Sequence, residues 1–340
     1  MQMLVLMLLV SAALGWTGTQ PQLAASDGHT YLAFGQGSAI SVLASTDQGV
    51  TFGTPSTIPV AGKMALGMRR GPRIAASRGA VVVTAIAGAK GGGADGDVVL
   101  YRSVDRGQTW SAAAIINDVP GSAREGLHGL AANPDGLVVV TWLDLRQKGT
   151  RLYAAVSRDH GLTWAPDVLV YASPSGSVCE CCHPSVHVSD VGDIAVMFRN
   201  SFEGNRDMYV ARSRDGRTFE PATKLGTGTW ALQGCPMDGG AVVLSPEGVV
   251  ATWRREDGVF LTTGTGPEQR LGTGRDSVVG VAGASRDVAW SGTDGVVLWR
   301  PGGAATTLGA GRFPSLIAFE RHSLVTWEDQ GRVQVRTVPR

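Results

Sequence analysis

Short apolar runs rich in valine alternate with glycine- or aspartate-containing turns along most of this chain. Each unit has a segment of small apolar residues, a turn, and a second apolar run that often ends in tryptophan or phenylalanine. Two strand-length runs joined by a tight turn predict a β-hairpin. We expect seven such hairpins, at residues 23–34, 74–84, 130–142, 186–198, 242–253, 278–290 and 315–327.

A second pattern, Ser-x-Asp-x-Gly-x-Thr-aromatic, recurs in the first two thirds of the chain. Its copies lie about 55 residues apart, and the fourth lacks one residue between the acid and the glycine. The Asp and Ser side chains can bond to backbone groups left open at a turn, and glycine takes a positive φ there without steric penalty. We interpret the four aspartates as structural caps: Asp47, Asp105, Asp159 and Asp215.

Strand-rich units repeating at this period predict sheets repeated around an axis, which is a β-propeller. Each hairpin would supply the two inner strands of a four-stranded antiparallel blade, and the Asp motif would join the outer two. We expect an all-β fold of seven blades in one domain, residues 19–340, with six blades as the alternative if a late unit is irregular. The last unit has room for about three strands, so a strand near residues 16–22 would complete it.

The first 18 residues read as a signal peptide. An apolar run shorter than a membrane-spanning helix precedes the small residues Ala13 and Gly15, which offer a cleavage site. The alternative is a buried N-terminal strand or helix. We therefore expect a periplasmic or secreted protein with no membrane span after processing.

Composition narrows the class of protein further. Of 340 residues, 43% are hydrophobic and 17% are charged, which favours a folded chain. The formal net charge is +1, so no overall field would attract nucleic acid. No nucleotide-binding loop, His-Glu-x-x-His or Gly-x-Ser-x-Gly motif is present. We expect a monomer without a cofactor and without a nucleic-acid partner.

Three of the four cysteines fall within five consecutive residues. An even number of cysteines in an exported chain favours disulfides among Cys179, Cys181, Cys182 and Cys235. A shift of about 55 residues places Cys235 opposite Glu180, so a bridge between two neighbouring loops is feasible. The alternative is a soft-metal thiolate site. Its ligands would be the four cysteines and His183, with His128 or Met237 as further donors.

The Ser-x-Asp-x-Gly-x-Thr-aromatic turns resemble the Asp-box, or BNR, repeats of the sialidase superfamily. The run from Cys179 to Cys182 resembles that of exported bacterial BNR proteins. The resemblance implies a propeller and, for a sialidase, three arginines that clamp a sugar carboxylate, a tyrosine nucleophile assisted by a glutamate, and an aspartate as general acid. Arg73-Ile74 resembles the start of the arginine-isoleucine-proline signature, with Ala75 in place of the proline. All five tyrosines fall in predicted strands rather than in the loops near the axis.

Propeller geometry indicates where a site would lie. Loops that precede each innermost strand and loops that follow each second strand open on one face, opposite the Asp motifs. Here these loops are rich in arginine and carboxylates, which suit an acidic sugar and its hydrolysis. Our catalytic candidates are Glu125, the best acid/base, with Asp144 and Asp238. Our substrate-binding candidates are Arg124, His128, Arg146, Arg199 and Arg254.

The sequence thus leaves three functions open. The first is an exported sialidase-like glycoside hydrolase that acts on or binds an acidic glycan or glycoconjugate through the arginine-rich face. The second is a non-catalytic propeller that binds a glycan or protein partner there. The third is a metal or redox role for the cluster of cysteine, histidine and methionine residues.

Overall fold

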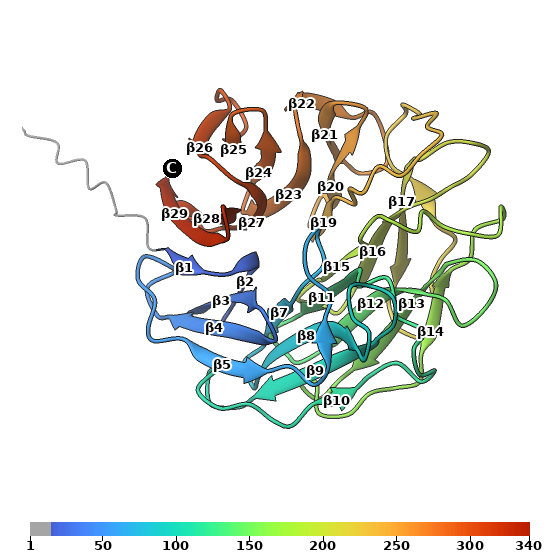
Figure 1. Ribbon diagram of the computed structural model, residues 1–340. Coiled ribbons are helices and arrows are strands. Elements are labelled where there is room, and N and C mark those ends of the chain that lie inside the picture. The colour runs from blue at the N-terminus through green and yellow to red at the C-terminus, as the bar shows by residue number, and fades with distance from the viewer. Residues whose placement is uncertain (1–14) are drawn as a thin grey trace, which may run out of the picture.

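Seven antiparallel sheets surround one axis in the computed structural model, which describes residues 15–340 (Figure 1). The predicted seven-bladed, all-β propeller is confirmed, and residues 15–340 contain no helix. The chain passes from blade to blade around the ring, so the first and last blades lie next to each other. Each predicted hairpin supplies the two inner strands of one blade.

The first three blades follow the same order from the axis outward. Blade 1 consists of β2 (Thr19–Ser26), β3 (His29–Gln36), β4 (Ala39–Ser45) and β5 (Ser56–Pro59). Blade 2 consists of β7 (Arg73–Ala76), β8 (Val81–Gly88), β9 (Asp97–Ser103) and β10 (Ala114–Ile115), with β6 (Lys63–Met64) on the same edge of β8 as β7. Blade 3 consists of β11 (His128–Ala132), β12 (Val138–Asp144), β13 (Arg151–Ser157) and β14 (Val168–Tyr171).

The next three blades repeat this plan. Blade 4 consists of β15 (Ser185–Val188), β16 (Ile194–Arg199), β17 (Met208–Ser213) and β18 (Thr223–Lys224). Blade 5 consists of β19 (Ala241–Ser245), β20 (Gly248–Arg255), β21 (Gly258–Thr263) and β22 (Gln269–Thr273). Blade 6 consists of β23 (Arg275–Ala282), β24 (Ser285–Gly292), β25 (Gly295–Trp299) and β26 (Thr306–Gly309).

The two ends of the described chain close the ring in blade 7. Its three inner strands are β27 (Arg312–Ala318), β28 (His322–Asp329) and β29 (Arg332–Pro339). The N-terminal strand β1 (Trp16–Thr17) pairs antiparallel with β29 as the outermost strand, with Trp16 opposite Val333. The indole of Trp16 also packs against Phe34 and Phe52 of blade 1. The expected N-terminal completion of the last blade is therefore present, but it is shorter than predicted, because residues 19–22 belong to β2 of blade 1.

The Asp motifs form the turns between the third and fourth strands of the first four blades. In blade 2 the hydroxyl of Ser103 donates to the carboxylate of Asp105 at 2.7 Å, and that carboxylate accepts the backbone N–H of Thr109 at 2.9 Å. The backbone N–H of Gly107 donates to the Ser103 hydroxyl at 2.8 Å. Because the bonding groups lie within a few residues, the turn forms from local sequence alone.

Apolar side chains fill the spaces between successive blades. One cluster joins Val82 and Leu100 of blade 2 to Val140 and Trp142 of blade 3, and similar clusters recur around the ring. Burying both faces of each blade explains why the strands read as nearly continuous apolar runs. The second strands also bury single threonines, such as Thr84, Thr141 and Thr252.

The signal peptide predicted for residues 1–18 lies mostly outside the described residues, which begin at position 15. Its last part includes Trp16 and Thr17, which form β1. In residues 15–340 no helix is long and apolar enough to cross a membrane.

Candidate functional site

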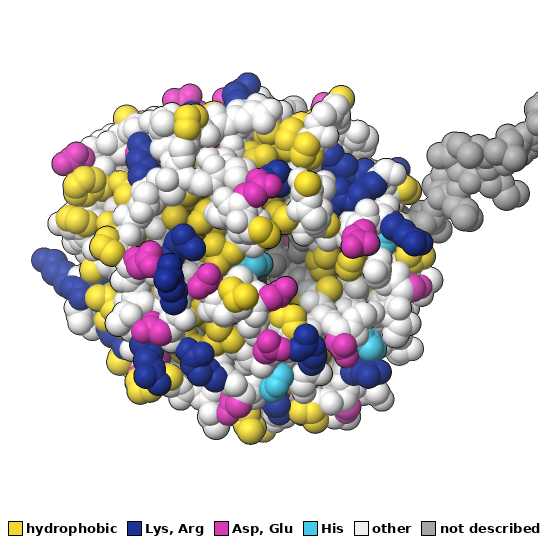
Figure 2. All heavy atoms as spheres, turned by 180° about the vertical axis from the view of Figure 1, so that it is seen from behind, with side chains coloured by type: hydrophobic (Ala, Val, Ile, Leu, Met, Phe, Trp, Pro, Cys, Tyr) yellow, Lys and Arg dark blue, Asp and Glu magenta, His cyan; other side chains and the backbone are white. Residues whose placement is uncertain are grey.

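The loops before each first strand and after each second strand open on the face opposite the Asp motifs, because antiparallel strands alternate in direction. We call this side the loop face. All the site residues predicted from the sequence lie on it or at the axial ends of strands that reach it. Over the side of the molecule seen in Figure 2, acidic and basic side chains are interspersed around a central hollow, with no large patch of one sign.

Glu125 lies in the loop before β11 and is partly exposed. A carboxylate oxygen of Glu125 lies 3.8 Å from the guanidinium of Arg70 in the neighbouring blade, and the Nε of Arg70 donates to the Glu125 carbonyl at 2.7 Å. Arg124 beside it is exposed. Glu125 and Arg70 thus tie the loops of blades 2 and 3 together, and this pair stands apart from the other predicted carboxylates.

Asp144 is buried at the end of β12, and its carboxylate accepts hydrogen bonds from two neighbouring side chains. Its carboxylate accepts the indole N–H of Trp142 at 2.8 Å and two guanidinium N–H groups of Arg146 at 2.8 and 2.9 Å. Arg146 also pairs with Asp167 and stacks on the ring of Tyr153, with Cζ 4.0 Å from the ring centre. The arrangement is a closed Asp144–Arg146–Asp167 ion network that stabilises the corner of blade 3.

His128 is fully buried on the first strand of blade 3. Its Nε2 lies 3.0 Å from the hydroxyl of Thr84, and burial, reinforced by the positive charge of Arg73, holds the pKa of His128 well below its usual value. A neutral, enclosed imidazole cannot attract an acidic ligand by charge. The position therefore joins blades 2 and 3 rather than facing the open side.

Arg199 and Asp238 come together beside the axis. The buried Arg199 guanidinium donates to the backbone carbonyls of Asp238 at 3.1 Å, Arg206 at 2.6 Å and Arg254 at 2.9 Å. It also lies over the ring of Trp230, which Arg254 approaches too, with Cζ atoms 5.2 and 5.4 Å from the ring centre. Arg199 thus uses its donors on backbone carbonyls and joins blade 4 to blade 5.

Asp238 is wholly buried, and its Oδ2 accepts the backbone N–H of Asp276 at 3.0 Å. Burial, together with the nearby charge of Asp276, raises the pKa of Asp238 to about 6. The other carboxylate oxygen of Asp238, and Oδ1 of Asp276, have no hydrogen-bond partner among the described residues. Asp276 Oδ1 lies 3.6 Å from the Nε of Arg69, an ion pair across the axis from blade 6 to blade 2.

A pocket of about 530 Å³ opens on the loop face over blades 5, 6 and 7. Three arginines from successive blades line it: Arg254 near the end of β20, Arg275 at the start of β23 and Arg312 at the start of β27. Asp257, Asp276 and Phe313 also line it. We call this the arginine pocket. Of the predicted site residues, Arg254 lines it and Asp238 lies directly behind it, bonded to Asp276.

Sequence reasoning missed Arg312 and did not select Arg275. A usable signal was present, because Gly274-Arg275 and Gly311-Arg312 stand at the same place before the first strands of blades 6 and 7. In both blades the residue that follows the arginine, Asp276 or Phe313, has a positive φ, of 57° and 56°. Aligning these two short units would have shown the repeated arginine.

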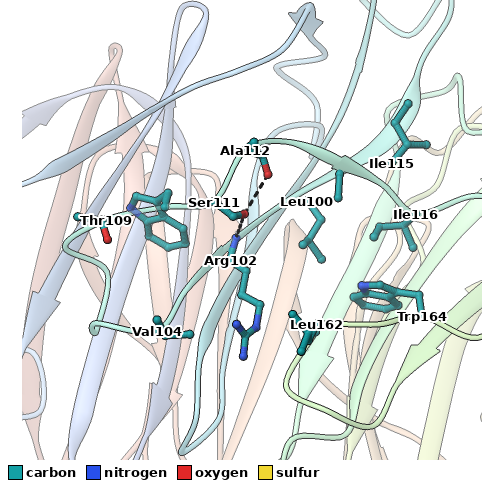
Figure 3. A pocket seen from close by; sticks show the side chains of 13 residues that line it. Leu100, Arg102, Val104, Thr109, Ser111, Ala112, Ile115, Ile116, Leu162 and Trp164 are labelled. Carbon is teal, nitrogen blue, oxygen red and sulfur yellow. Dashed lines mark hydrogen bonds between the residues drawn. The ribbon is translucent and has the colours of Figure 1, made fainter.

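A second pocket, of about 510 Å³, lies on the outer side where blades 2 and 3 meet (Figure 3). Trp164, Leu162 and Ile115 face it, and it contains none of the predicted site residues. Its walls come from the outer strands and the Asp-motif turns of the two blades. It is therefore separate from the arginine pocket, and Arg102 is the one charged residue among the described residues that line it.

The cysteines form a compact group with one outlier. The Sγ of Cys179 lies 3.8 Å from that of Cys181 and 3.5 Å from that of Cys182, and the three sulfurs lie within 4.8 Å of one another. Cys235 is exposed and outside this group. All four are free thiols in this structure, so the disulfides remain predictions. The Nδ1 of His183 accepts the backbone N–H of Gly239 at 3.3 Å.

Comparisons with solved structures show the fold at low identity. The chain superposes on the Hadza microbial sialidase Hz136 with a TM-score of 0.53 and 15% identity, covering 87% of this chain and 73% of that one. For the Penicillium chrysogenum α-L-arabinanase complexed with arabinobiose the TM-score is 0.57 at 15% identity, covering 95% and 93%. For a PL25 ulvan lyase bound to -[GlcA(1-4)Rha3S]- it is 0.55 at 11% identity, covering 96% of each chain.

Comparison at the sequence level is more specific. No curated protein sequence gives a significant match. Residues 74–231, which span blades 2 to 4 and enter the loop before blade 5, match the family model of the BNR repeat-like domain. Three of the four Asp motifs fall inside that range. Residues 74–231 of this seven-bladed β-propeller are thus similar to a BNR repeat-like domain, and that match covers a little less than half of the chain.

Proposed function

We propose that this propeller recognises an acidic glycan in the arginine pocket. The single observation that carries the proposal is the meeting of Arg254, Arg275 and Arg312 from three successive blades in one pocket. A planar guanidinium donates two parallel hydrogen bonds to a carboxylate or sulfate, so three of them favour a ligand with such groups.

All three arginines are anchored: Arg254 donates to the Glu256 carbonyl at 2.6 Å, and Arg312 pairs with Glu328 at 3.4 Å. Arg275 donates to the Met237 carbonyl at 3.1 Å, and the guanidinium of Arg312 lies over the ring of Phe313, with Cζ 5.0 Å from the ring centre. The side chains of Arg275 and Arg312 are 46% and 64% exposed. Because a guanidinium has five N–H donors, contacts of this kind orient it without using all of them. Pre-orientation lowers the entropy lost on binding an anion.

The saccharide part of the proposal draws support from the neighbouring folds. Their described ligands, arabinobiose and -[GlcA(1-4)Rha3S]-, are carbohydrates, and one neighbour is a sialidase. At sequence identities of 11–15%, these neighbours show only that the architecture is shared. The acidic character of the ligand is inferred here from the arginines of this chain.

Binding is supported better than hydrolysis. The two carboxylates that line the pocket are already paired, Asp257 with Arg270 at 3.2 Å and Asp276 with Arg69 and Arg275 at 3.6 Å. A glycosidase needs one carboxyl group free to protonate the leaving oxygen and another to act on the opposite side. No tyrosine lines this pocket. The predicted catalytic roles of Glu125, Asp144 and Asp238 therefore stay predictions.

We also propose that the chain acts outside the cytoplasm, in the periplasm or as a secreted protein. The apolar leader and the small residues at 13 and 15 support this. N-terminal sequencing of the protein from the surrounding medium or periplasm tests it. A mature N-terminus between residues 14 and 16 would keep β1 in blade 7, whereas an uncleaved leader would contradict export.

The test of the glycan proposal is binding by titration calorimetry to sialylated, uronate-containing and sulfated oligosaccharides and to a neutral arabino-oligosaccharide. We expect an acidic member to bind, with affinity that falls as salt rises. Arg275→Gln and Arg312→Gln should each weaken binding by about ten- to a hundredfold, since a charge-assisted hydrogen bond contributes about 1.5–3 kcal/mol. Arg78→Gln is the matched control, because Arg78 is an exposed arginine in the β7–β8 hairpin on the opposite face.

Equal binding of the neutral sugar, or no loss in either arginine variant, would contradict the proposal. The same mixtures, analysed by mass spectrometry for released sugars, test hydrolysis. Release that disappears in Glu125→Gln would make the protein a hydrolase with Glu125 as its acid/base. Binding without release would establish a non-catalytic propeller.

A further inference from the structure

The three clustered cysteines belong to one short loop on the loop face. They lie between β14 and β15, just before blade 4 begins. Cys179 and Cys182 are buried, while Cys181 is partly exposed. The arginine pocket does not include them. The function proposed above makes no use of this group, so its chemistry has to be considered separately.

The spacing of the sulfurs fits a shared metal ion. The Sγ atoms of Cys179 and Cys181 are 3.8 Å apart and those of Cys179 and Cys182 are 3.5 Å apart. An ion with metal–sulfur bonds of about 2.3 Å holds two sulfurs about 3.8–4.0 Å from each other. The two distances from the Cys179 sulfur are therefore within about half an ångström of this geometry, and all three sulfurs lie within 4.8 Å of one another.

The number of sulfurs also favours an ion over a bridge. Three thiols cannot all be satisfied by disulfides among themselves, because any one bridge leaves a thiol over. The fourth cysteine, Cys235, is exposed and stands outside the group. A single ion with three sulfur ligands would satisfy all three.

The surrounding backbone holds the loop in this shape. The N–H of Cys179 donates to the carbonyl of Arg199 at 3.1 Å, and the N–H of Asp238 in blade 5 donates to the Sγ of Cys182 at 3.4 Å. The hydroxyl of Ser177 donates to the carboxylate of Glu180 at 2.9 Å, which turns that acid toward Ser177. The carbonyl of the same Asp238 accepts a hydrogen bond from the guanidinium of Arg199. The positive charge of Arg199 is therefore held near the sulfur of Cys182. The N–H of Asp238 and the nearby charge of Arg199 both stabilise negative charge on the Cys182 thiolate.

We propose that Cys179, Cys181 and Cys182 bind one Cu(I) ion through three thiolates. Soft sulfur ligands favour Cu(I) and Zn²⁺ among the metals of proteins. Structural zinc takes four protein ligands, and among the described residues no fourth cysteine, histidine or carboxylate belongs to the cluster. The nearest histidine in sequence, His183, uses its Nδ1 to accept the N–H of Gly239. Binding of the ion releases the protons of the three thiols and changes no oxidation state.

The test uses the mature protein, fully reduced and kept without oxygen. Cu(I) is added in the presence of a competing colorimetric Cu(I) chelator, and the copper retained per chain is measured together with the ultraviolet thiolate-to-copper absorption. We expect one Cu(I) per chain. Cys181→Ser, at the partly exposed position, should weaken binding by about a hundredfold or more while circular dichroism shows the fold retained. Cys235→Ser, the matched control, should bind as the unchanged protein does.

Three results would overturn the proposal. They are no copper retained by the reduced protein, equal retention by Cys181→Ser, and preferential binding of Zn²⁺ when both ions are offered. The outcome is independent of the glycan proposal, because the arginine variants leave all three thiols in place. Titration of the acidic glycan against Cys181→Ser checks this independence directly.

Discussion

Arg146 donates two guanidinium N–H groups to the carboxylate of Asp144 only two residues before it, at 2.8 and 2.9 Å. The pair is almost fully buried, and the same guanidinium reaches Asp167. A predicted catalytic carboxylate and a predicted ligand-binding arginine are therefore partners of each other. Substituting either residue should therefore lower the free energy of unfolding of the protein.

We expect Asp144→Asn to destabilise the protein by about 3 kcal/mol, because it leaves a buried guanidinium with one carboxylate instead of two. Urea denaturation followed by tryptophan fluorescence measures the change. Asp135→Asn is the control, since Asp135 forms an exposed pair with Arg78, and such pairs contribute about 0–1 kcal/mol. A loss of glycan turnover in Asp144→Asn at unchanged stability would instead support a catalytic role.

Acid should destabilise the propeller through His187 of β15. Its Nδ1 accepts the N–H of Leu244 at 3.2 Å, and burial lowers the pKa of His187 to about 4. An unfolded histidine has a pKa near 6.5. Between these two values the unfolded chain binds the proton and the folded chain does not. The stability contribution is thus complete above about pH 6.5 and falls as pH drops toward 4, by up to about 3 kcal/mol.

His187→Asn keeps an acceptor for the Leu244 N–H but cannot take up a proton. The difference in free energy of unfolding between pH 7.5 and pH 4.5 should therefore be smaller in this variant by about 2–3 kcal/mol. Urea denaturation at the two pH values measures it. The same loss in both proteins would show that His187 does not control the acid response.

Replacing a turn glycine by alanine should destabilise the protein by an amount that depends on the atoms beside the new Cβ. Gly161 has a φ of 79°, and a Cβ there would lie 2.9 Å from Val82 of the neighbouring blade. Gly28 has a similar φ of 73° and open space around it. Gly28→Ala should cost about 1 kcal/mol from backbone strain, and Gly161→Ala about 1–3 kcal/mol more from overpacking. Equal effects on thermal unfolding would mean that the blades separate freely at this turn.

Ring closure should depend on Trp16. Its strand supplies the outer edge of blade 7, and its ring centre lies 6.4 Å from that of Phe34 and 6.0 Å from that of Phe52. Trp16→Ala should destabilise the protein by about 2 kcal/mol, less than a fully buried tryptophan would. Hydrogen exchange should show the loss of protection first in β29. Unchanged protection there would indicate that blade 7 holds without its N-terminal strand.

The repeating architecture follows from local stretches of the amino-acid sequence. Asp105, Ser103 and Thr109 bond to one another within a few residues, so the turn and its place between two outer strands follow from local sequence. The valine-rich hairpins can also be predicted from local sequence, because strand pairing across a tight turn needs no distant partner. The number of blades and the closing strand near Trp16 followed from counting these units.

Which polar residues share a site depends instead on how the blades are arranged in space. The rotation between blades sets the distances between their loops, and sequence spacing does not report it. Arg254, Arg275 and Arg312 therefore meet in one pocket, while Glu125 and Asp144 stand in separate groups. The N–H of Asp238, before blade 5, bonds to Cys182, before the neighbouring blade 4, yet Cys235, three residues before Asp238, is exposed and outside the thiol group. Local bonds fix a turn from its own residues, but a pocket depends on where several loops end in space.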